Sequence, residues 1–344
     1  MNVAAAIRAR DPAELPGKRD EDWRWTDLRG LIRQVPEPSA QVDAAAVGAG
    51  PFDALAEDSI VVANGQGAAH IGVEPGETKV VALRVVSRGD GAHAARVSVD
   101  VEAAGRLVLL ETYEGDAGSY LSQTGLLFSL GKDAAVERIV LASDGAEGVT
   151  VSQAQVELAP GAAFAQTVLT GGARRQRIET LVRHPGGHAS LRLDGVYLLA
   201  EKRHADQTTV VTHEGLHGVT EQLTKGVVRD QARGVFQGRI VVTEGADHTD
   251  ARMGHHALIL SDRAEVDAKP ELEIYADDVA CAHGNTVGAL DEDALFYARQ
   301  RGIPEPEARA MLTEAFIGEV VDRIEHEPAR EIARAWAAER LRGG

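Results

Sequence analysis

The sequence predicts a mainly β protein, with a body of about 200 residues followed by helices. Three observations support this. Short runs rich in β-branched residues recur from about residue 56 to 285, turn-forming residues interrupt them every 10 to 16 residues, and no sustained apolar stripe of helical period occurs between residues 80 and 275. We therefore divide the chain into an N-terminal mixed and helical segment (1–55), a β core (56–285) and a C-terminal helical domain (286–344).

The β core is predicted from its individual runs. Apolar and polar residues alternate within several of them, as in Arg177–Arg183, and a period of two turns one face inward and the other to water. A sandwich, a barrel or a solenoid would each bury such strands, and the length favours a solenoid, which grows by adding coils. The clearest runs are Ile60–Val62, Val80–Val86, Ala95–Val101, Arg106–Leu110, Ala135–Leu141, Val149–Leu158, Ala163–Leu169, Ser190–Leu199 and Gly234–Val242.

The C-terminal helices are predicted from their end signals. Asp291 can cap a first helix that ends near Gly302, Pro304 suits the start of a second, and Pro328 opens a third. Short amphipathic helices of this kind usually dock on the protein body or on a partner. The second helix has apolar residues at the spacing of one helix face: Ala308, Met311, Leu312, Ala315, Phe316 and Val320.

The composition excludes several classes of protein. The chain has 344 residues and a formal net charge of −17, which argues against binding to nucleic acid or to anionic membranes. Its single cysteine, Cys281, excludes an internal disulfide framework and a cysteine-rich metal site. Apolar runs are too short for a membrane span, and the first residues do not resemble a signal peptide, so we expect a cytoplasmic protein.

Two sequence patterns suggest metal chemistry. His213–His217 reads H-E-x-x-H, the zinc protease pattern, but the glycine inside it disfavours the helix that would bring both imidazoles to one face. Cys281 and His283 stand two residues apart, so in a strand they share a face and could be two ligands of a soft or borderline metal. Seven of the twelve histidines also lie between His204 and His283, and we interpret most of them as scattered polar positions on a sheet face, with at most one functional member. No phosphate-binding loop and no G-x-S-x-G elbow is present.

Several long motifs resemble one known family. Ala264–Val279 (AEVDAKPELEIYADDV), Cys281–Gly288 (CAHGNTVG) and Leu290–Tyr297 (LDEDALFY) occur in the order found in the SufB/SufD family of iron–sulfur cluster assembly proteins. Asp20–Leu28 (DEDWRWTDL) and Ala232–Val242 (ARGVFQGRIVV) also resemble that family. Within it the chain is more similar to the SufD branch, because Gly284 follows His283 where SufB-like chains tend to carry an acidic residue.

The resemblance implies a fold and a set of partners. It implies a right-handed parallel β-helix core with a C-terminal helical domain. It also implies assembly with a SufB-like paralogue, through the β-helix, and with a SufC-like ABC ATPase, through the C-terminal helices. By the resemblance, His283 lies at the interface with the paralogue and could be a metal ligand shared with that partner. Cys281 is a weaker candidate for a role at the same interface. For the ATPase surface we expect Asp291, Leu295, Phe296, Tyr297, Met311, Leu312 and Phe316.

Two functions of different class follow. The first is a non-catalytic scaffold subunit for iron–sulfur cluster assembly, which holds no cofactor alone and, in the complex, carries a transient cluster and a reduced flavin. The second is a stand-alone metal-dependent β-helical hydrolase that uses the histidine-rich region. The first is preferred, because one thiol cannot hold a whole cluster and the chain lacks an ATPase loop. An exposed β-helix edge would also allow the isolated chain to form a homodimer.

Overall fold

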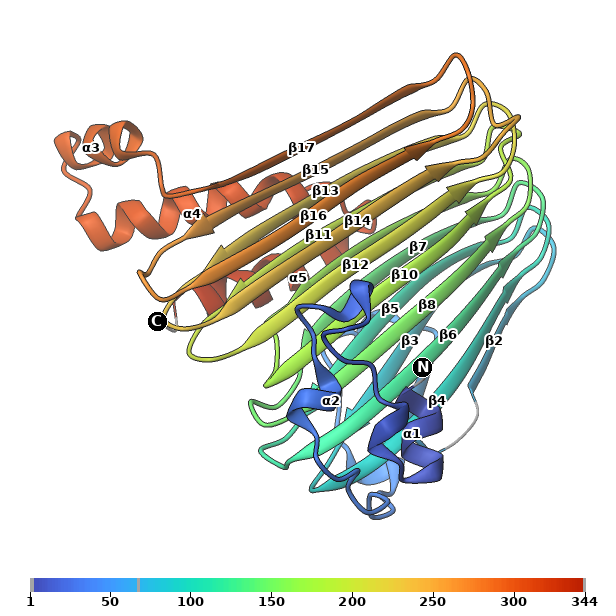
Figure 1. Cartoon of the computed structure of the whole chain (residues 1–344), viewed down its shortest axis with the longest axis horizontal. Helices are drawn as coiled ribbons and strands as arrows, with labels where there is room; N and C mark the ends of the chain where they lie inside the picture. Colours follow the sequence, from blue (N-terminus) through green and yellow to red (C-terminus); the bar gives the residue numbers. More distant parts are fainter. Residues whose placement is uncertain (1–2, 67–68, 343–344) are drawn as a thin grey trace.

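The computed structural model describes residues 3–66 and 69–342 and has a parallel β-helix at its centre (Figure 1). Successive strands alternate between two sheets, one of nine strands in the order β1-β3-β5-β7-β9-β11-β13-β15-β17 and one of eight in the order β16-β14-β12-β10-β8-β6-β4-β2. All neighbouring strands within each sheet are parallel. The predicted mainly β solenoid with C-terminal helices is therefore confirmed. 

The strands span nearly the whole interval from Asp58 to Gly288. Their bounds are β1 Asp58–Ala63, β2 Ala69–Val73, β3 Thr78–Ser87, β4 Gly91–Val101, β5 Arg106–Gly115, β6 Tyr120–Leu130, β7 Ala135–Ser143, β8 Val149–Leu158, β9 Ala163–Thr170, β10 Arg175–His184, β11 Ser190–Leu199, β12 His204–His213, β13 Val219–Val228, β14 Arg233–Val242, β15 Asp250–Ile259, β16 Glu265–Ile274 and β17 Ala280–Gly288. All the runs predicted from the sequence fall inside these strands.

The coils repeat with an almost constant length. His184 pairs with His213, 29 residues later, and Arg233 pairs with Glu265, 32 residues later. Side chains of one face of each strand point into the solenoid, where apolar residues such as Leu109, Phe164 and Val211 form the main core. Because each coil covers only its neighbour, the last coil leaves its inner face uncovered.

Most of the N-terminal segment packs on the outer face of the eight-stranded sheet, whereas its last residues, around Phe52, pack on the nine-stranded sheet. Its helices α1 (Val3–Ala9) and α2 (Leu28–Leu31) bury apolar residues against Ala92, Leu121 and Val149. Short 3-10 turns occupy Pro12–Glu14, Glu21–Trp23, Ala44–Ala46 and Asp53–Leu55. Figure 1 shows this segment (blue) lying across strands of the sheet rather than continuing the solenoid.

The C-terminal helices are α3 (Glu292–Gln300), α4 (Glu305–Val321) and α5 (Glu327–Arg342). As predicted, the Asp291 carboxylate caps α3 by accepting hydrogen bonds from the backbone N–H groups of Asp293 and Ala294. Helices α4 and α5 cover the outer face of the nine-stranded sheet, where Ile317 and Ala333 pack in one cluster with Val196. Among the helices that the structure describes, none combines the length and the apolar character needed to cross a membrane.

The apolar face predicted for α4 is only partly correct. Ala308 and Val320 are buried, whereas Met311 is 51% exposed and Ala315 is exposed. The face that docks on the sheet is instead completed by residues that the spacing left out: Thr313, Ile317 and Val321. The helix lies between the sheet on one side and α3 and α5 on others, so no single apolar stripe describes its packing.

Candidate functional site

The site predicted around Cys281 and His283 lies on β17, at the uncovered end of the β-helix. Cys281 pairs with Ala251 and His283 with Met253 on the preceding strand of the same sheet, β15. Ala251 and Met253 belong to the interior core, so the side of β17 that carries Cys281 and His283 is the inner face of the last coil. The two side chains therefore share a face, as their spacing predicts, and no further coil covers them.

The two residues differ in burial. Cys281 is half-buried and packs against the interior core, whereas His283 is exposed at the open end. Burial raises the pKa of the Cys281 thiol above its ordinary value, and the hydrogen bond from the Ala251 backbone only partly offsets this. The thiol is therefore protonated at neutral pH, which makes it a poor metal ligand in this chain alone. His283 is the more accessible donor of the pair.

A buried hydrogen-bond relay reaches the same end of the solenoid. The Asn285 side-chain oxygen lies 2.7 Å from Nδ1 of His255, and Nε2 of the same imidazole lies 2.8 Å from the Tyr197 hydroxyl. An amide oxygen can only accept, so Nδ1 of His255 donates to Asn285 and Nε2 accepts from Tyr197. Burial lowers the pKa of His255 to about 4, which keeps this imidazole neutral. Within residues 3–66 and 69–342 the Asn285 amide N–H₂ group has no acceptor, and it lies on the same face of β17 as His283.

The histidine-rich region does not converge on one site. His213 ends β12 inside the solenoid, where Nε2 is 3.0 Å from the Thr220 hydroxyl, while His217 lies in an exposed turn with φ of 60°. The H-E-x-x-H pattern is thus split between a strand and a turn. His217 instead stacks between His188 and His248 of neighbouring coils, at ring distances of 5.3 and 5.0 Å. No group of three or more His, Cys, Asp or Glu residues that could hold a metal occurs in residues 3–66 and 69–342.

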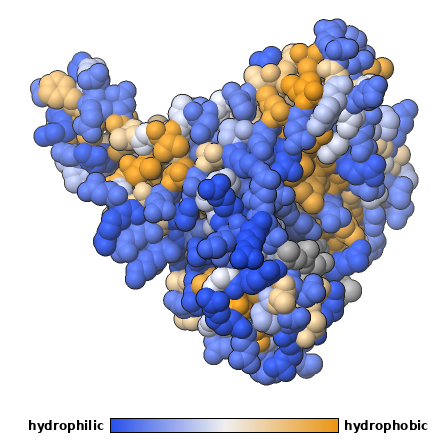
Figure 2. All heavy atoms as spheres, in the orientation of Figure 1, coloured by the Kyte–Doolittle hydropathy of each residue, from blue (hydrophilic) through white to orange (hydrophobic). Residues whose placement is uncertain are grey.

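The residues expected to bind an ATPase have unequal exposure. Phe296 and Tyr297 of α3 are each 61% exposed and Met311 of α4 is 51% exposed, whereas Leu295 is 2% exposed and supports the packing of the helices. Phe316 lies under the ammonium group of Lys225, 4.4 Å from the ring centre, and is partly buried against the sheet. The remaining two residues are Leu312, which is partly buried, and Asp291, the exposed cap of α3. Figure 2 shows apolar residues (orange) around α4, together with a second apolar region over the strands at the right of the same face.

A buried charge network under the N-terminal segment was not anticipated. The Arg177 guanidinium pairs with Asp206 at 3.0 Å and with Glu179 at 2.6 Å, and the ring of Trp23 covers it at 4.3 Å. The Thr26 hydroxyl also donates to Asp206.

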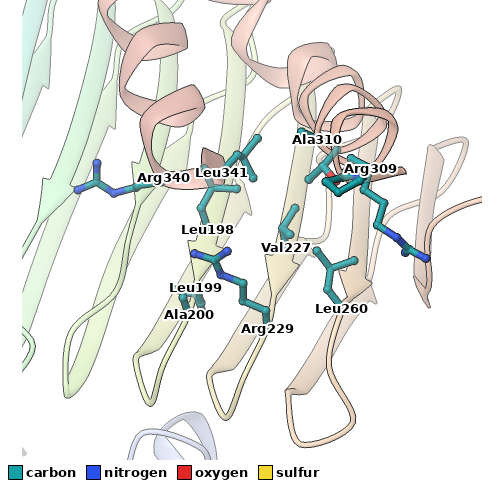
Figure 3. Close-up of a pocket in the computed structure, with 12 residues that line it drawn as sticks. Leu198, Leu199, Ala200, Val227, Arg229, Leu260, Arg309, Ala310, Arg340 and Leu341 are labelled. Atoms are coloured by element: carbon teal, nitrogen blue, oxygen red, sulfur yellow. Dashed lines mark hydrogen bonds between the residues drawn. The ribbon is translucent and has the colours of Figure 1, made fainter. Parts of the chain in front are cut away.

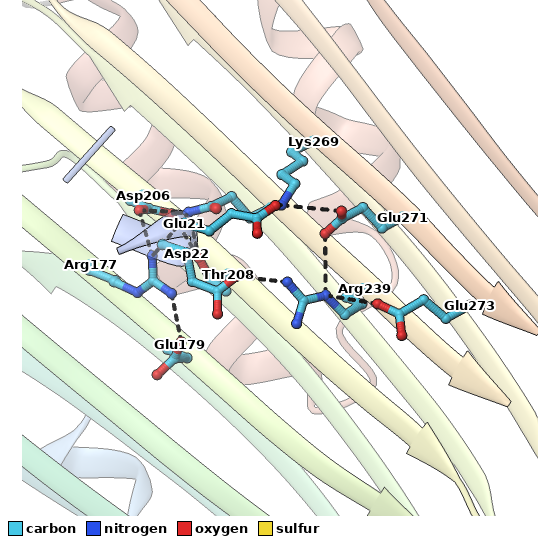
Figure 4. Close-up of polar contacts among 11 residues, drawn as sticks. Glu21, Asp22, Arg177, Glu179, Asp206, Thr208, Arg239, Lys269, Glu271 and Glu273 are labelled. Carbon is cyan, nitrogen blue, oxygen red and sulfur yellow. Dashed lines mark hydrogen bonds and ion pairs between the residues drawn. The ribbon is translucent and has the colours of Figure 1, made fainter. Parts of the chain in front are cut away.

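The same segment reaches the last coils of the eight-stranded sheet. Glu21 pairs with Lys269 at 2.8 Å, and Asp22 pairs with Arg239 at 2.7 Å (Figure 4). The only sequence signal was the dense polar and aromatic run Asp20–Leu28. Through these side-chain contacts, the run Asp20–Leu28 links four strands of the eight-stranded sheet.

Comparison with known proteins identifies relatives of the chain. Residues 84–316 match a family model described as the SufBD core domain of SUF system FeS cluster assembly. The chain is 37% identical to the iron–sulfur cluster assembly protein SufD of Escherichia coli over 53% of this chain and 43% of that protein. It is 26% identical to an iron–sulfur cluster assembly SufBD family protein of Mycobacterium tuberculosis over 93% of this chain and 88% of the relative. The match to the SufD protein of Bacillus subtilis, at 35% identity, covers 34% of this chain and 27% of that protein. The Escherichia coli and Bacillus subtilis matches thus span less than half the length of those relatives.

Proposed function

The chain belongs to the SufB/SufD family of iron–sulfur cluster assembly proteins, and from this we propose that it is a non-enzymatic scaffold subunit. In this proposal it pairs with a SufB-like paralogue through the open end of the β-helix and with a SufC-like ATPase through the C-terminal helices. The observation that carries the proposal is the position of Cys281 and His283 on the inner face of an uncovered last coil. Two donors are too few for a cluster, so further ligands must come from a partner.

The two strand edges at the open end, β16 and β17, differ in how well each could pair with a strand of a partner. Strand β16 carries five charged side chains and Pro270, and both features discourage the addition of another strand. Strand β17, with the sequence ACAHGNTVG, contains no acidic residue, lysine, arginine or proline. The β17 edge is therefore the better template for a strand of another chain. A paralogue that pairs there meets His283 and Cys281 directly, and a second copy of this chain would use the same edge when the paralogue is absent.

A matched pair of substitutions tests which edge pairs. Val287 on β17 and Ile274 on β16 are 43% and 42% exposed, so a lysine at either position has similar freedom to reach water. We expect Val287→Lys to abolish the complex with the paralogue and Ile274→Lys to leave most of it, as measured by light scattering after size-exclusion chromatography. Equal loss with both substitutions would show that β17 is not the preferred edge.

The ATPase surface is assigned to the exposed apolar residues of α3 and α4. The double substitution Phe296→Glu with Met311→Glu places charge in that surface without touching the buried Leu295. We expect it to remove binding of the ATPase while the circular dichroism spectrum stays that of a folded β-helix. Leu216→Glu is the control, because Leu216 is also exposed, at 48%, but lies in the turn between β12 and β13. Unchanged binding in the double variant would move the docking site elsewhere.

The role of His283 is tested in the assembled complex. As an interface ligand, or as a proton acceptor, it would be required for cluster formation but not for assembly. We expect His283→Ala to give a complex of normal composition with little cluster absorbance, and Cys281→Ser to have a smaller effect. Wild-type cluster yield in His283→Ala would remove this residue from the mechanism. The cluster is cargo of the complex, and we propose that reduced flavin also binds only after assembly.

The stand-alone hydrolase finds no support among the relatives. The relatives named above are described as iron–sulfur cluster assembly proteins. The histidines that suggested a hydrolase are divided between the interior, as for His213, and exposed turns, as for His217. Their geometry does not assemble the ligand set that such an enzyme needs.

A further inference from the structure

The hydrogen-bond relay through the last coils ends at Asn285, on the same open face of β17 as His283. Asn285 pairs with His255 of β15, and the Asn285 side-chain oxygen lies 2.7 Å from Nδ1 of that imidazole. At the other end of the relay, Nε2 of His255 lies 2.8 Å from the hydroxyl of Tyr197 on β11. The relay therefore reaches from β11, past β13 and β15, to the uncovered strand.

Two glycines make room for the side chain of Tyr197. Leu198 and Val227 face the helices on the outside of the sheet (Figure 3), so their neighbours Tyr197 and Gly226 face the interior. Gly226 pairs with Tyr197, and a Cβ atom at Gly226 would overlap the phenol ring. A Cβ atom at Gly234 of β14 would overlap the same ring. The missing side chains thus leave the space through which the phenol reaches His255.

The imidazole of His255 is held by ring contacts and is neutral. Its ring lies nearly parallel to that of Phe236, with 4.7 Å between the ring centres, and stacks with the ring of Tyr197 at 6.0 Å. Burial lowers the pKa of His255 to about 4, so the ring carries no charge at neutral pH. A neutral imidazole has one N–H group and one bare nitrogen, so it donates at one end of the relay and accepts at the other.

The buried end of the relay decides which nitrogen of His255 carries the proton. The Tyr197 hydroxyl is fully buried, and burial holds its pKa well above the ordinary value, so it keeps its proton. Within residues 3–66 and 69–342 its hydrogen-bond partner is Nε2 of His255 alone. A proton on Nε2 would leave the phenolic hydrogen without an acceptor in the core, which is costly. Nε2 therefore accepts, Nδ1 donates to the Asn285 oxygen, and the Asn285 N–H₂ group is left over.

The leftover donor stands where a ligand of His283 would lie. Positions 283 and 285 share one face of β17 and are about 7 Å apart, from a rise of about 3.3 Å per residue. A small ligand at the His283 imidazole is thus within reach of the amide. A partner that covers this face would take the N–H₂ group out of water, where an unpaired donor is costly. Its acceptor then has to come from what binds at this face.

We propose that the Asn285 amide donates a hydrogen bond to a sulfur atom of the iron–sulfur cluster carried beside His283, with its orientation set by His255. The inference rests on the proposed function, because it takes the cluster as the ligand at this face. An amide N–H₂ group can only donate, so it meets the anionic sulfur atoms of a cluster rather than its iron. Hydrogen bonds to the sulfurs help to set the reduction potential. A donor stabilises the more negative, reduced cluster and so raises that potential.

The orientation of the amide is tested on the isolated chain, without partners or cluster. Nitrogen-15 NMR distinguishes a protonated imidazole nitrogen from a bare one, and we expect His255 to be protonated at Nδ1. Protonation at Nε2 would turn the Asn285 oxygen outward and overturn the proposal.

The donor role is tested in the complex with the SufB-like paralogue and the SufC-like ATPase. We expect Asn285→Ala to leave the composition of the complex unchanged and to lower the reduction potential of the cluster. A tenfold weaker preference for the reduced form corresponds to about 59 mV for one electron. Thr286→Val is the matched control, because the Thr286 hydroxyl also lies 2.7 Å from Nδ1 of a β15 histidine, His256, but on the outer face of β17. It should leave the potential at the wild-type value.

The outcomes separate this inference from the proposed function. An unchanged or raised potential in Asn285→Ala, or an equal shift in Thr286→Val, would overturn the inference while the complex still carries a cluster. Loss of the cluster from Asn285→Ala alone, in a complex of normal composition, would support contact between the amide and the cluster. A wild-type complex that carries no cluster would overturn the proposed function, and the donor role with it. Circular dichroism verifies that both variants keep the wild-type fold.

Discussion

Acid should unfold this protein at a mildly acidic pH, because five of its histidines are buried and burial lowers the pKa of each. Burial lowers the pKa of His93, His204 and His255 to about 4 and that of His213 to about 3, from an ordinary value of 6.5. The charge of the neighbouring His184 lowers the pKa of His213 further. In the unfolded chain each of these imidazoles takes up a proton near pH 6.5, whereas in the folded protein it does not until the pH is well below 5.

The sign and size of the effect follow from proton linkage. Below pH 6.5 the unfolded chain binds more protons than the folded one, so the free energy of unfolding falls as the pH falls. At pH 5 each histidine has cost about 2 kcal/mol, or about 8 kcal/mol for the four, at about 1.4 kcal/mol per pKa unit. Asp194 acts in the opposite direction, because burial raises its pKa to about 6, and returns about 1.4 kcal/mol at pH 5. The remaining loss is comparable with the whole stability of a typical domain, about 5–15 kcal/mol.

Urea unfolding followed by circular dichroism at pH 7.5, 6 and 5 measures this loss. We expect the midpoint to fall steeply between pH 6 and 5, with His213→Gln reducing the slope by about one proton. His70→Gln is the control, because the His70 side chain is 64% exposed, and it should leave the slope unchanged. A slope below one proton between pH 6 and 5, or an unchanged slope in His213→Gln, would refute the reasoning.

Three further predictions concern buried polar contacts, each measured as the free energy of unfolding in urea. Glu111→Gln leaves the fully buried Arg138 guanidinium without its bidentate partner and should cost about 3–5 kcal/mol, much of which is recovered when Arg138→Met is added. Thr26→Val removes the hydroxyl that donates to Asp206 and should cost about 1–3 kcal/mol, while Thr78→Val, at an exposed strand end, should cost far less. Tyr197→Phe leaves Nε2 of His255 without a donor and should cost about 1–3 kcal/mol; no loss would mean that a different tautomer satisfies the ring.

The β-helix could be predicted only in part from local pattern. Runs rich in valine, isoleucine and leucine, such as Val80–Val86, are strands because their residues favour a pleated and buried surface. Strands such as Ala69–Val73, Asp250–Ile259 and Ala280–Gly288 contain histidine, glycine and polar residues and have no such local preference. They become strands because a neighbouring coil presents a row of free backbone groups in register. That template is a property of the fold and is invisible in a window of ten residues.

The candidate site, too, could be predicted from the sequence only in part. The shared face of Cys281 and His283 follows from their spacing of two, which any strand converts into proximity. The relay from Asn285 through His255 to Tyr197 joins residues 30 and 58 positions apart, and only the coil length brings them together. A search for polar residues separated by 26 to 32 positions would have found the pair His255 and Asn285, since this is the spacing at which all coils after the first repeat.

The uncovered last coil connects the fold to the proposed chemistry. In every preceding coil, the next coil buries the inner face. Met253, for example, is only 3% exposed, because the layer that contains His283 lies over it. The layer of His283, Asn285 and Val287 lacks such a cover, so whatever pairs with β17 also removes this layer from water. Pairing would then bury the exposed part of Val287 and place the imidazole in a dry surrounding, where charge interactions with a metal are strengthened. In the proposed complex, association and completion of the ligand set would thus be a single event, and a chain with two donors would serve a cluster only together with its partner.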